Sequence, residues 1–427
     1  MSSPSEIRVP PMFRVRQKFA AAPRIAPADF PSLLRKPLSA VLDPLKPGAC
    51  VAVAVGSRGI SHLAPIVCEV VAILRAAGHQ PFIVPAMGSH GGATSEGQGR
   101  LLADYGITEA SVGVPIRAAM EAECMGRTEE GVDLFCSVEA LRADAIVLVN
   151  RVKPHTDFGG PIGSGLLKMA VVGLGKQAGA LAFHRAAHRL GYEQTLRTLA
   201  RTALRRLPIC CGVAILEGPS HDIAGLRVVP AAEMEAREPE LVAEAARLMP
   251  RLPFDEIDLL IVDRLGKNIS GTGMDPNVIG RQIHGYSLLE SEQRFRPFIR
   301  RIFVRDLTPE THGNATGIGM ADFTTTRLVE AIDRKATYTN ALTAMSLQGS
   351  KIPIHFDTDR ECIAQALASL PLADPLEARI VRIADTLSLE VMELSETYAG
   401  EVRQSPRFEI LGSPAEMEFD AAGNLAR

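Results

Sequence analysis

The chain of 427 residues contains no tryptophan, no Cys-x-x-Cys pair and no long apolar run. No stretch approaches the roughly 20 apolar residues that span a bilayer, and the N-terminal segment lacks the uninterrupted apolar core of a secretory signal. The net charge is only -3, so the composition gives no reason to expect binding to nucleic acid or to an anionic membrane surface. We therefore expect a cytoplasmic protein that binds neither.

The cysteines offer no disulfide framework. They are odd in number, and several of them lie inside apolar runs. The full set is Cys50, Cys68, Cys124, Cys136, Cys210, Cys211 and Cys362. Buried free thiols in a reducing compartment are the simplest interpretation.

The composition that remains is that of an ordinary globular protein, 46% hydrophobic and 22% charged, in a chain too long for one typical core. Short apolar runs alternate with segments of helical periodicity. The expected strands are 50–55, 81–86, 144–149, 210–216 and 257–263. The expected helices are 62–78, 95–105, 176–190, 194–206 and 232–249. This alternation predicts an α/β fold with a doubly wound, mainly parallel sheet and helices on both faces.

A proline-containing, charged stretch at 249–258 marks the predicted domain boundary. We expect an N-terminal cofactor-binding α/β domain over 1–252 and a smaller C-terminal α/β domain over 256–400, with the active site in the cleft between them. We expect residues 401–427 to form a tail, and packing of this tail on the first domain stays an open alternative. The oligomeric state stays open, a homo-oligomer included.

Polar side chains follow three of the predicted strands. Arg58 comes after the strand at 50–55, His90 after the next strand, and His155 after the strand at 144–149. Each histidine taken singly would be interpreted as a surface or structural residue. The carboxyl ends of parallel strands share one edge of a sheet, however, and ligands bind outside that edge. The joint placement therefore predicts one pocket.

A lysine and two histidines come next along the chain. Lys168 lies among apolar neighbours, which suits either a snorkelling side chain or an amine made reactive by desolvation. His184 and His188 lie four residues apart on a predicted helix, so they share a face that could ligate a metal. Arg185 stands where a zinc protease needs its glutamate, which argues against that class. Arg58 suits a clamp on a carboxylate, with a structural salt bridge as the alternative.

The segment GLGKQA at 173–178 fits the loose dinucleotide fingerprint GxGxxA, and Glu193 follows at a suitable distance. It supports an alternative function, a NAD-dependent 2-hydroxy acid dehydrogenase. The Gly-rich turns at 266–281 and 312–326 we interpret mainly as structure, because Asn and Asp there commonly bond their own backbone.

Taken together, the motifs resemble the lactate racemase family, the nickel-pincer nucleotide-dependent racemases and epimerases of 2-hydroxy acids, as a divergent member. The resemblance covers 50–190 and rests on the Arg58 turn, the Gly-Ser-His-x-x-x-Thr turn at 88–94, the Pro-His pair at 154–155, Lys168 and His184. Val55 stands where the family has an acidic residue, and the substrate is left open.

The resemblance implies roles for these residues. Lys168 would carry the nickel-pincer nucleotide, a nickel ion with a pyridinium bis-thiocarboxylate mononucleotide, through a covalent thioamide. His184 would ligate the nickel, His90 and His155 would be the acid/base pair, and Arg58 would contact the substrate. The implied activity is racemisation or epimerisation by proton-coupled hydride transfer, with the cofactor-synthesis enzymes as partners. A non-catalytic homologue that binds nickel or a hydroxy acid is a further alternative.

The chemistry of the residues agrees with those roles. Two imidazoles on either side of a 2-hydroxy acid provide a base for each enantiomer, and each can return the proton as an acid. Imidazole and sulfur donors suit nickel.

Overall fold

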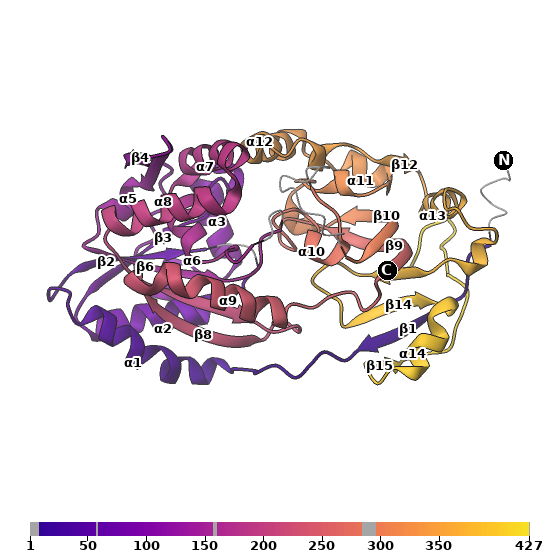
Figure 1. Cartoon of the computed structure of the whole chain (residues 1–427), viewed down its shortest axis with the longest axis horizontal. Helices are drawn as coiled ribbons and strands as arrows, with labels where there is room; N and C mark the ends of the chain where they lie inside the picture. Colours follow the sequence, from indigo (N-terminus) through magenta and orange to yellow (C-terminus); the bar gives the residue numbers. More distant parts are fainter. Residues whose placement is uncertain (1–7, 57–58, 157–159, 284–295, 427) are drawn as a thin grey trace. The chain divides into compact units, whose positions relative to one another are not determined.

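The structure is a computed structural model that describes residues 8–56, 59–156, 160–283 and 296–426. It divides into two compact units (Figure 1). Unit 1 comprises residues 1–21, 250–342 and 346–427, and unit 2 comprises residues 22–249 and 343–345.

Unit 2 is built on a five-stranded sheet in the order β3-β2-β6-β7-β8. The first four strands are parallel, and β8 runs antiparallel to β7. The strands are β2 (Cys50–Val55), β3 (Gln80–Pro85), β6 (Ala145–Arg151), β7 (Ile209–Glu217) and β8 (Ile223–Pro230). A separate hairpin joins β4 (Ala122–Arg127) to β5 (Asp133–Ser137).

Helices cover both faces of this sheet. Alternate residues of β2, such as Val51 and Val53, share one core with α1 (Phe30–Leu42) and α2 (Leu63–Ala76). On the opposite face, Leu166 of α6 (Leu166–Lys168) packs against Gly212 of β7. The other helices of the unit are α3 (Ser95–Asp104), α4 (Glu109–Val112), α5 (Val138–Leu141), α7 (Lys176–Leu190), α8 (Tyr192–Arg206) and α9 (Met234–Leu248). The doubly wound α/β class that the sequence predicts is confirmed.

Unit 1 has an eight-stranded sheet in the order β12-β11-β10-β9-β13-β14-β1-β15. The strands from β12 to β13 are parallel, and β14, β1 and β15 are antiparallel to their neighbours. The parallel strands are β9 (Glu256–Leu265), β10 (Phe298–Leu307), β11 (Phe323–Thr325), β12 (Ile354–Phe356) and β13 (Ile380–Ile383). The antiparallel ones are β1 (Met12–Gln17), β14 (Val391–Ser395) and β15 (Phe408–Ile410). The helices are α10 (Pro276–Ile279), α11 (Thr326–Glu330), α12 (Arg334–Ala344), α13 (Asp359–Ala368) and α14 (Ala399–Gln404).

The two ends of the described chain lie in unit 1, whereas we expected residues 1–252 to form one domain and the tail to return to it. The reason lies in strand pairing, because β1 pairs with β14 and β15, and Met12 also bridges to Ala415. The isolated apolar positions of β1 lie between prolines and charges in the sequence, so the segment is not recognisable as a strand without its partners.

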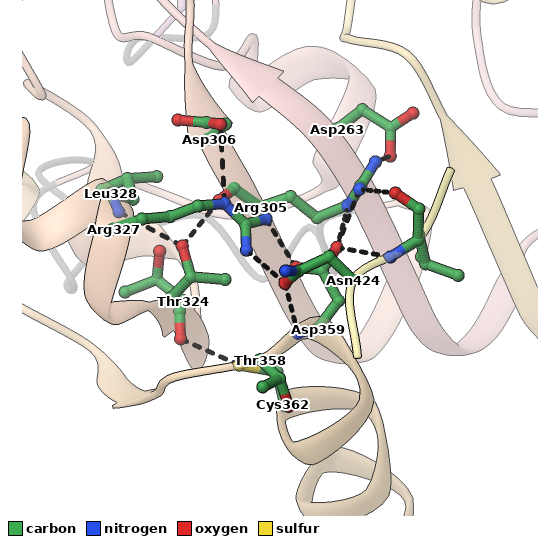
Figure 2. A network of polar contacts seen from close by, with 12 residues as sticks. Asp263, Arg305, Asp306, Thr324, Arg327, Leu328, Thr358, Asp359, Cys362 and Asn424 are labelled. Carbon is green, nitrogen blue, oxygen red and sulfur yellow. Dashed lines mark hydrogen bonds and ion pairs between the residues drawn. The ribbon is translucent and has the colours of Figure 1, made fainter. Parts of the chain in front are cut away.

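Unit 1 also contains a buried network of charges (Figure 2). The Asp359 carboxylate is fully buried and accepts hydrogen bonds from Arg305 at 2.8 Å and from Arg327 at 2.6 Å. Arg305 bonds in addition to Asp263 at 2.8 Å and to the Leu425 carbonyl oxygen at 2.7 Å. The backbone N–H of Leu425 donates to Asp359 at 3.0 Å. The network thus fastens the chain near Leu425 to the sheet.

Candidate active site

The strand order of unit 2 reverses between β2 and β6. The chain passes from β2 outward to β3, returns to β6 on the other side of β2, and continues outward to β7. In open α/β sheets, ligands bind outside the carboxyl ends of the strands at such a reversal. The turns that leave β2 and β6 contain the Arg58 and His155 positions of the sequence prediction, so this edge is the place to look for a site.

Asn150, near the end of β6, connects the two sides of the reversal. Its side-chain amide donates to the Gly165 carbonyl oxygen at 3.0 Å, just before α6. Its side-chain oxygen lies so close to Gly56 that any Cβ there would collide with it. The glycine that follows β2 is therefore required by a close approach. Asn150 couples the turn after β2 to the segment that leads into Lys168.

A nearly buried ion pair supports the turn that follows β2. Arg151 and Glu217, at the carboxyl ends of β6 and β7, form a salt bridge in which their side chains are 10% and 9% exposed. The other Glu217 oxygen accepts a hydrogen bond from the Ser61 N–H at 2.7 Å. Ser61 belongs to the turn after β2. Arg58 belongs to it as well, but that residue lies outside the described residues.

His155 and Lys168 are in direct contact. The Lys168 Nζ lies 2.7 Å from the His155 Nε2, and the His155 side chain is buried while Lys168 is half-buried. When the amine is charged it can only donate, so the imidazole Nε2 accepts and the ring carries its proton on Nδ1. The Tyr192 ring packs on His155 at 4.4 Å between centroids and faces the lysine amine at 5.9 Å. An acid/base group and a nucleophilic amine therefore share one aromatic wall.

His184 is connected to this pair through aromatic rings. It lies on α7 next to Phe183, whose buried ring contacts Tyr192 edge to face at 5.3 Å. The centroids of the Phe183 and His184 rings are 5.4 Å apart. The Tyr192 hydroxyl donates to the Gly163 carbonyl oxygen at 3.1 Å, which anchors the whole stack to the chain between His155 and Lys168.

The turn that carries His90 is held by its main chain against the segment that follows Lys168. The Gly88 N–H donates to the Gly173 carbonyl oxygen at 3.2 Å. The buried Gln98 side chain donates to the carbonyl oxygens of Gly88 at 2.9 Å and of His90 at 3.4 Å. His90 thus lies on a turn bonded to Gly173, at the end of the helical segment that begins at Leu166 and contains Lys168.

Lys176 supports the turn that carries His90. Its side chain is fully buried, and the amine donates to the Pro85 carbonyl oxygen at 2.6 Å and to the Gln98 side-chain oxygen at 3.0 Å. Among the residues that the structure describes, no carboxylate forms a salt bridge with it. Burial lowers the pKa of this amine to about 8, against the weaker influence of the Cys136 and Glu121 charges.

The dinucleotide interpretation of GLGKQA is wrong. The fingerprint needs a strand before the first glycine, but residues Met169–Gly173 form a turn of π-helix. A Cβ at Gly173 would lie 2.7 Å from the Ala86 carbonyl oxygen, and one at Gly175 would collide with the Val171 carbonyl oxygen. These glycines allow close packing of the chain.

Of the predicted site residues, the structure brings His155 and Lys168 into contact, links His184 to them through two rings, and ties the His90 turn to the same helical segment. In the described part of the chain, no three His, Cys, Asp or Glu side chains are grouped to hold a metal ion by themselves. Sequence reasoning missed Asn150, Gln98 and Tyr192. For Asn150 a signal existed, since it is the first polar residue after the buried run AIVLV.

Comparison with known proteins reveals similarity of fold without similarity of sequence. No protein-family model and no curated protein matches the chain. A crystal structure of a Thermotoga maritima protein matches 87% of this chain and 99% of its own at 14% identity, with a TM-score of 0.53. The lactate racemase apoprotein from Thermoanaerobacterium thermosaccharolyticum matches 91% of this chain and 96% of its own at 13% identity, with a TM-score of 0.47. The likeness to the Thermotoga maritima structure shows the fold alone.

The described residues include no single helix that is both long and apolar enough to cross a membrane. Only the sharply bent pair formed by 166–173 and 176–190 reaches that length and composition when its two parts are counted together.

Proposed function

We propose that this protein is a racemase or epimerase of a 2-hydroxy acid that uses a nickel-pincer nucleotide. The observation that carries the proposal is the 2.7 Å contact between the His155 imidazole and the Lys168 amine at the topological reversal of unit 2. A buried imidazole is suited to proton transfer, and a half-buried lysine is suited to a covalent bond with a cofactor. Finding both on one aromatic wall favours a tethered cofactor beside an acid/base group.

The residues fit such a group. Lys168 would hold it through a thioamide, and His184 would complete the coordination of the nickel. The pincer brings its own sulfur and carbon donors, so a single imidazole from the protein suffices, and a cluster of several protein ligands is not needed. When bound, the group would accept the hydride from carbon 2 of the substrate and return it.

The protein's own residues would bind the substrate and move its hydroxyl proton. His155 and His90 would each remove that proton from one enantiomer and give it back to the other. Arg58 would hold the carboxylate through paired hydrogen bonds. The Tyr192 and Phe183 rings would keep water from one side of the site. We place the enzyme in the cytoplasm, where enzymes that make the cofactor would load it.

The experiment is co-expression of the full chain with the cofactor-synthesis enzymes, followed by mass spectrometry of the peptide that contains Lys168. We expect an added mass on that lysine, and inversion at carbon 2 when 2-hydroxy acids are screened with the loaded protein. Lys168→Arg keeps the charge but is expected to carry no adduct. Arg189→Lys, at an exposed position on α7, serves as the matched control and is expected to load normally.

The alternatives give different results. Turnover that requires added NAD, with no adduct on Lys168, would support a dehydrogenase, although the packing of Gly173 and Gly175 speaks against it. An adduct without inversion of any 2-hydroxy acid would support a non-catalytic homologue. Replacing His90 or His155 by alanine should abolish inversion and leave nickel bound; loss of the nickel would mean that these residues are ligands.

A further inference from the structure

The segment that carries Lys168 starts against a buried carboxyl group. Glu238 on α9 is fully buried, and its Oε2 accepts a hydrogen bond from the Leu166 N–H at 3.1 Å. Its Oε1 is also buried and has no hydrogen-bond partner in the described part of the chain. Gly165 lies directly against this carboxyl group, and any Cβ there would collide with it. A buried, half-satisfied carboxyl group is costly, so its presence needs an explanation.

Two polar side chains fix the start of the segment from opposite sides. Asn150 donates to the Gly165 carbonyl oxygen, and Glu238 accepts from the next N–H group along the chain. Leu166 between them packs on Gly212 of the sheet. Only two residues further on, the Lys168 amine reaches His155. The backbone contacts of Asn150 and Glu238 therefore lie within three residues of the lysine whose amine contacts His155.

The surroundings of Glu238 leave its charge poorly compensated. Charged and titratable groups on the elements packed against α9 include Lys168 on α6, Arg197 and Arg201 on α8, Cys210, Cys211 and Glu217 on β7, Arg227 on β8 and Glu233. Arg197 and Arg201 form salt bridges with Glu235, and Arg227 with Glu244. Burial raises the pKa of Glu238 to about 7, and the Leu166 and Leu167 N–H groups and the Arg197 charge oppose the rise.

We propose that Glu238 is a positioning residue whose ionisation sets where the Lys168 amine lies relative to His155. An ionised carboxylate accepts the N–H bonds at the start of the segment about twice as strongly as the neutral acid does. The segment is held when Glu238 is charged and loosened when it is protonated. The link to cofactor attachment rests on the proposed function; the link between Glu238 and the lysine amine does not.

The test measures the reactivity of Lys168 in the full chain made without the cofactor enzymes. Trace labelling with acetic anhydride, quantified by mass spectrometry of the Lys168 peptide, is carried out from about pH 5.5 to pH 9. In the wild-type chain we expect a step near neutral pH in addition to the titration of the amine itself. The step should be about fivefold, as expected for exchanging a charge-assisted hydrogen bond for a neutral one.

Glu238→Gln keeps an oxygen acceptor for the Leu166 N–H but cannot ionise, so the step should vanish. Glu244→Gln, on the same helix in a partly exposed ion pair, should retain it. A step that persists in Glu238→Gln would overturn the proposal. A purely structural role would change the melting temperature without changing the shape of the labelling profile.

A second measurement needs no variant and decides the matter if Glu238→Gln does not fold. Infrared difference spectra of the wild-type chain should show the band of a buried carboxylic acid disappearing with the same midpoint as the labelling step. Two separate midpoints would refute the coupling. Absence of an adduct on Lys168 after co-expression would count against the proposed function and leave both of these results intact, so the two failures can be told apart.

Discussion

The charge network of unit 1 and two fully buried charged groups of unit 2 are stabilised in opposite ways, although unit 2 also contains the nearly buried Arg151–Glu217 pair. In unit 1, Asp359 is fully buried yet contacts two arginines, and Arg305 contacts two carboxylates and a carbonyl oxygen. In unit 2, Lys176 and Glu238 are equally buried, but their hydrogen-bond partners are neutral groups. The pKa values of both unit 2 groups are displaced towards neutrality by burial.

This difference distinguishes charged groups that only stabilise the fold from buried groups that lie beside the candidate site. A network in which the buried charges contact opposite charges fixes one conformation. An uncompensated buried group destabilises the fold, and it persists where a titratable or precisely held group is useful. Lys176 supports the turn that carries His90, and Glu238 supports the start of the helical segment that carries Lys168. The following predictions test this contrast, from the largest effect to the smallest.

Asp359→Ala should remove the common partner of Arg305 and Arg327. Because the buried Arg305 would keep Asp263 as its ionic partner and lose Asp359, we expect a loss of about 3 kcal/mol in the free energy of unfolding. Urea denaturation followed by circular dichroism measures it. Glu409→Ala breaks an exposed pair with Arg16 and should cost less than about 0.5 kcal/mol. Equal stability of the two variants would mean that the network is not what holds unit 1 together.

Lys176→Met should change how stability depends on pH. The folded pKa of Lys176 is about 8 and the ordinary value is 10.5, so between these values the unfolded chain binds more protons. Wild-type stability should therefore gain about 3 kcal/mol from this group as pH rises through that window, at about 1.4 kcal/mol per pKa unit. The variant should lack this gain. Lys335→Met, at an exposed position, is the control. Parallel curves for wild type and Lys176→Met would contradict the assignment.

Gly165→Ala should push Glu238 and the Lys168 segment apart. The φ and ψ values of Gly165 are -150° and -146°, so the effect should come chiefly from the collision with the carboxyl group. Overpacking of this kind should cost about 2 kcal/mol. The methyl group should also impair cofactor attachment. Gly99→Ala, on α3 with open space around it, should be neutral or stabilise by up to about 1 kcal/mol. Thermal unfolding of the two variants measures the difference. A Gly165→Ala chain as stable as the Gly99→Ala chain would contradict the close contact between Gly165 and the Glu238 carboxyl group.

Tyr192→Phe should keep the ring against His155 and lose the hydroxyl's hydrogen bond to Gly163. We expect a loss of about 1 kcal/mol in unfolding free energy. Calorimetry measures the loss, with Tyr338→Phe at an exposed position as the control. A larger loss would show that the hydroxyl contributes more to the site than one anchoring bond.

Much of unit 2 can be predicted from the sequence because its strands are buried on both faces. Runs such as those at 50–55 and 145–149 are continuously apolar, and each is followed by a turn. The same topology places His155 beyond the carboxyl end of β6, as its position after a strand predicts, and the structure finds it there in contact with Lys168. Helix 176–190 has the bounds that its periodicity predicts.

What the sequence could not reveal depends on contacts between distant residues. Glu238 lies in the charged stretch EAREPELVAE, which is typical of a solvent-facing helix, and its partner Leu166 is 72 residues away. Lys176 lies within GLGKQA, which matches a nucleotide-binding motif by its spacing. Only the fold shows that its amine is buried and donates to the Pro85 carbonyl oxygen. The strand β1 is recognisable only by its pairing with β14 and β15.

The place of β1 between β14 and β15 has a consequence for biosynthesis. Its pairing partners begin at Val391, so the strand emerges from the ribosome long before either of them exists. At about 5–20 residues per second it waits some tens of seconds with unpaired backbone groups, while residues 22–249 are made and can fold first. The two charged side chains of β1, Arg14 and Arg16, are those expected to keep such a waiting edge from joining a foreign sheet.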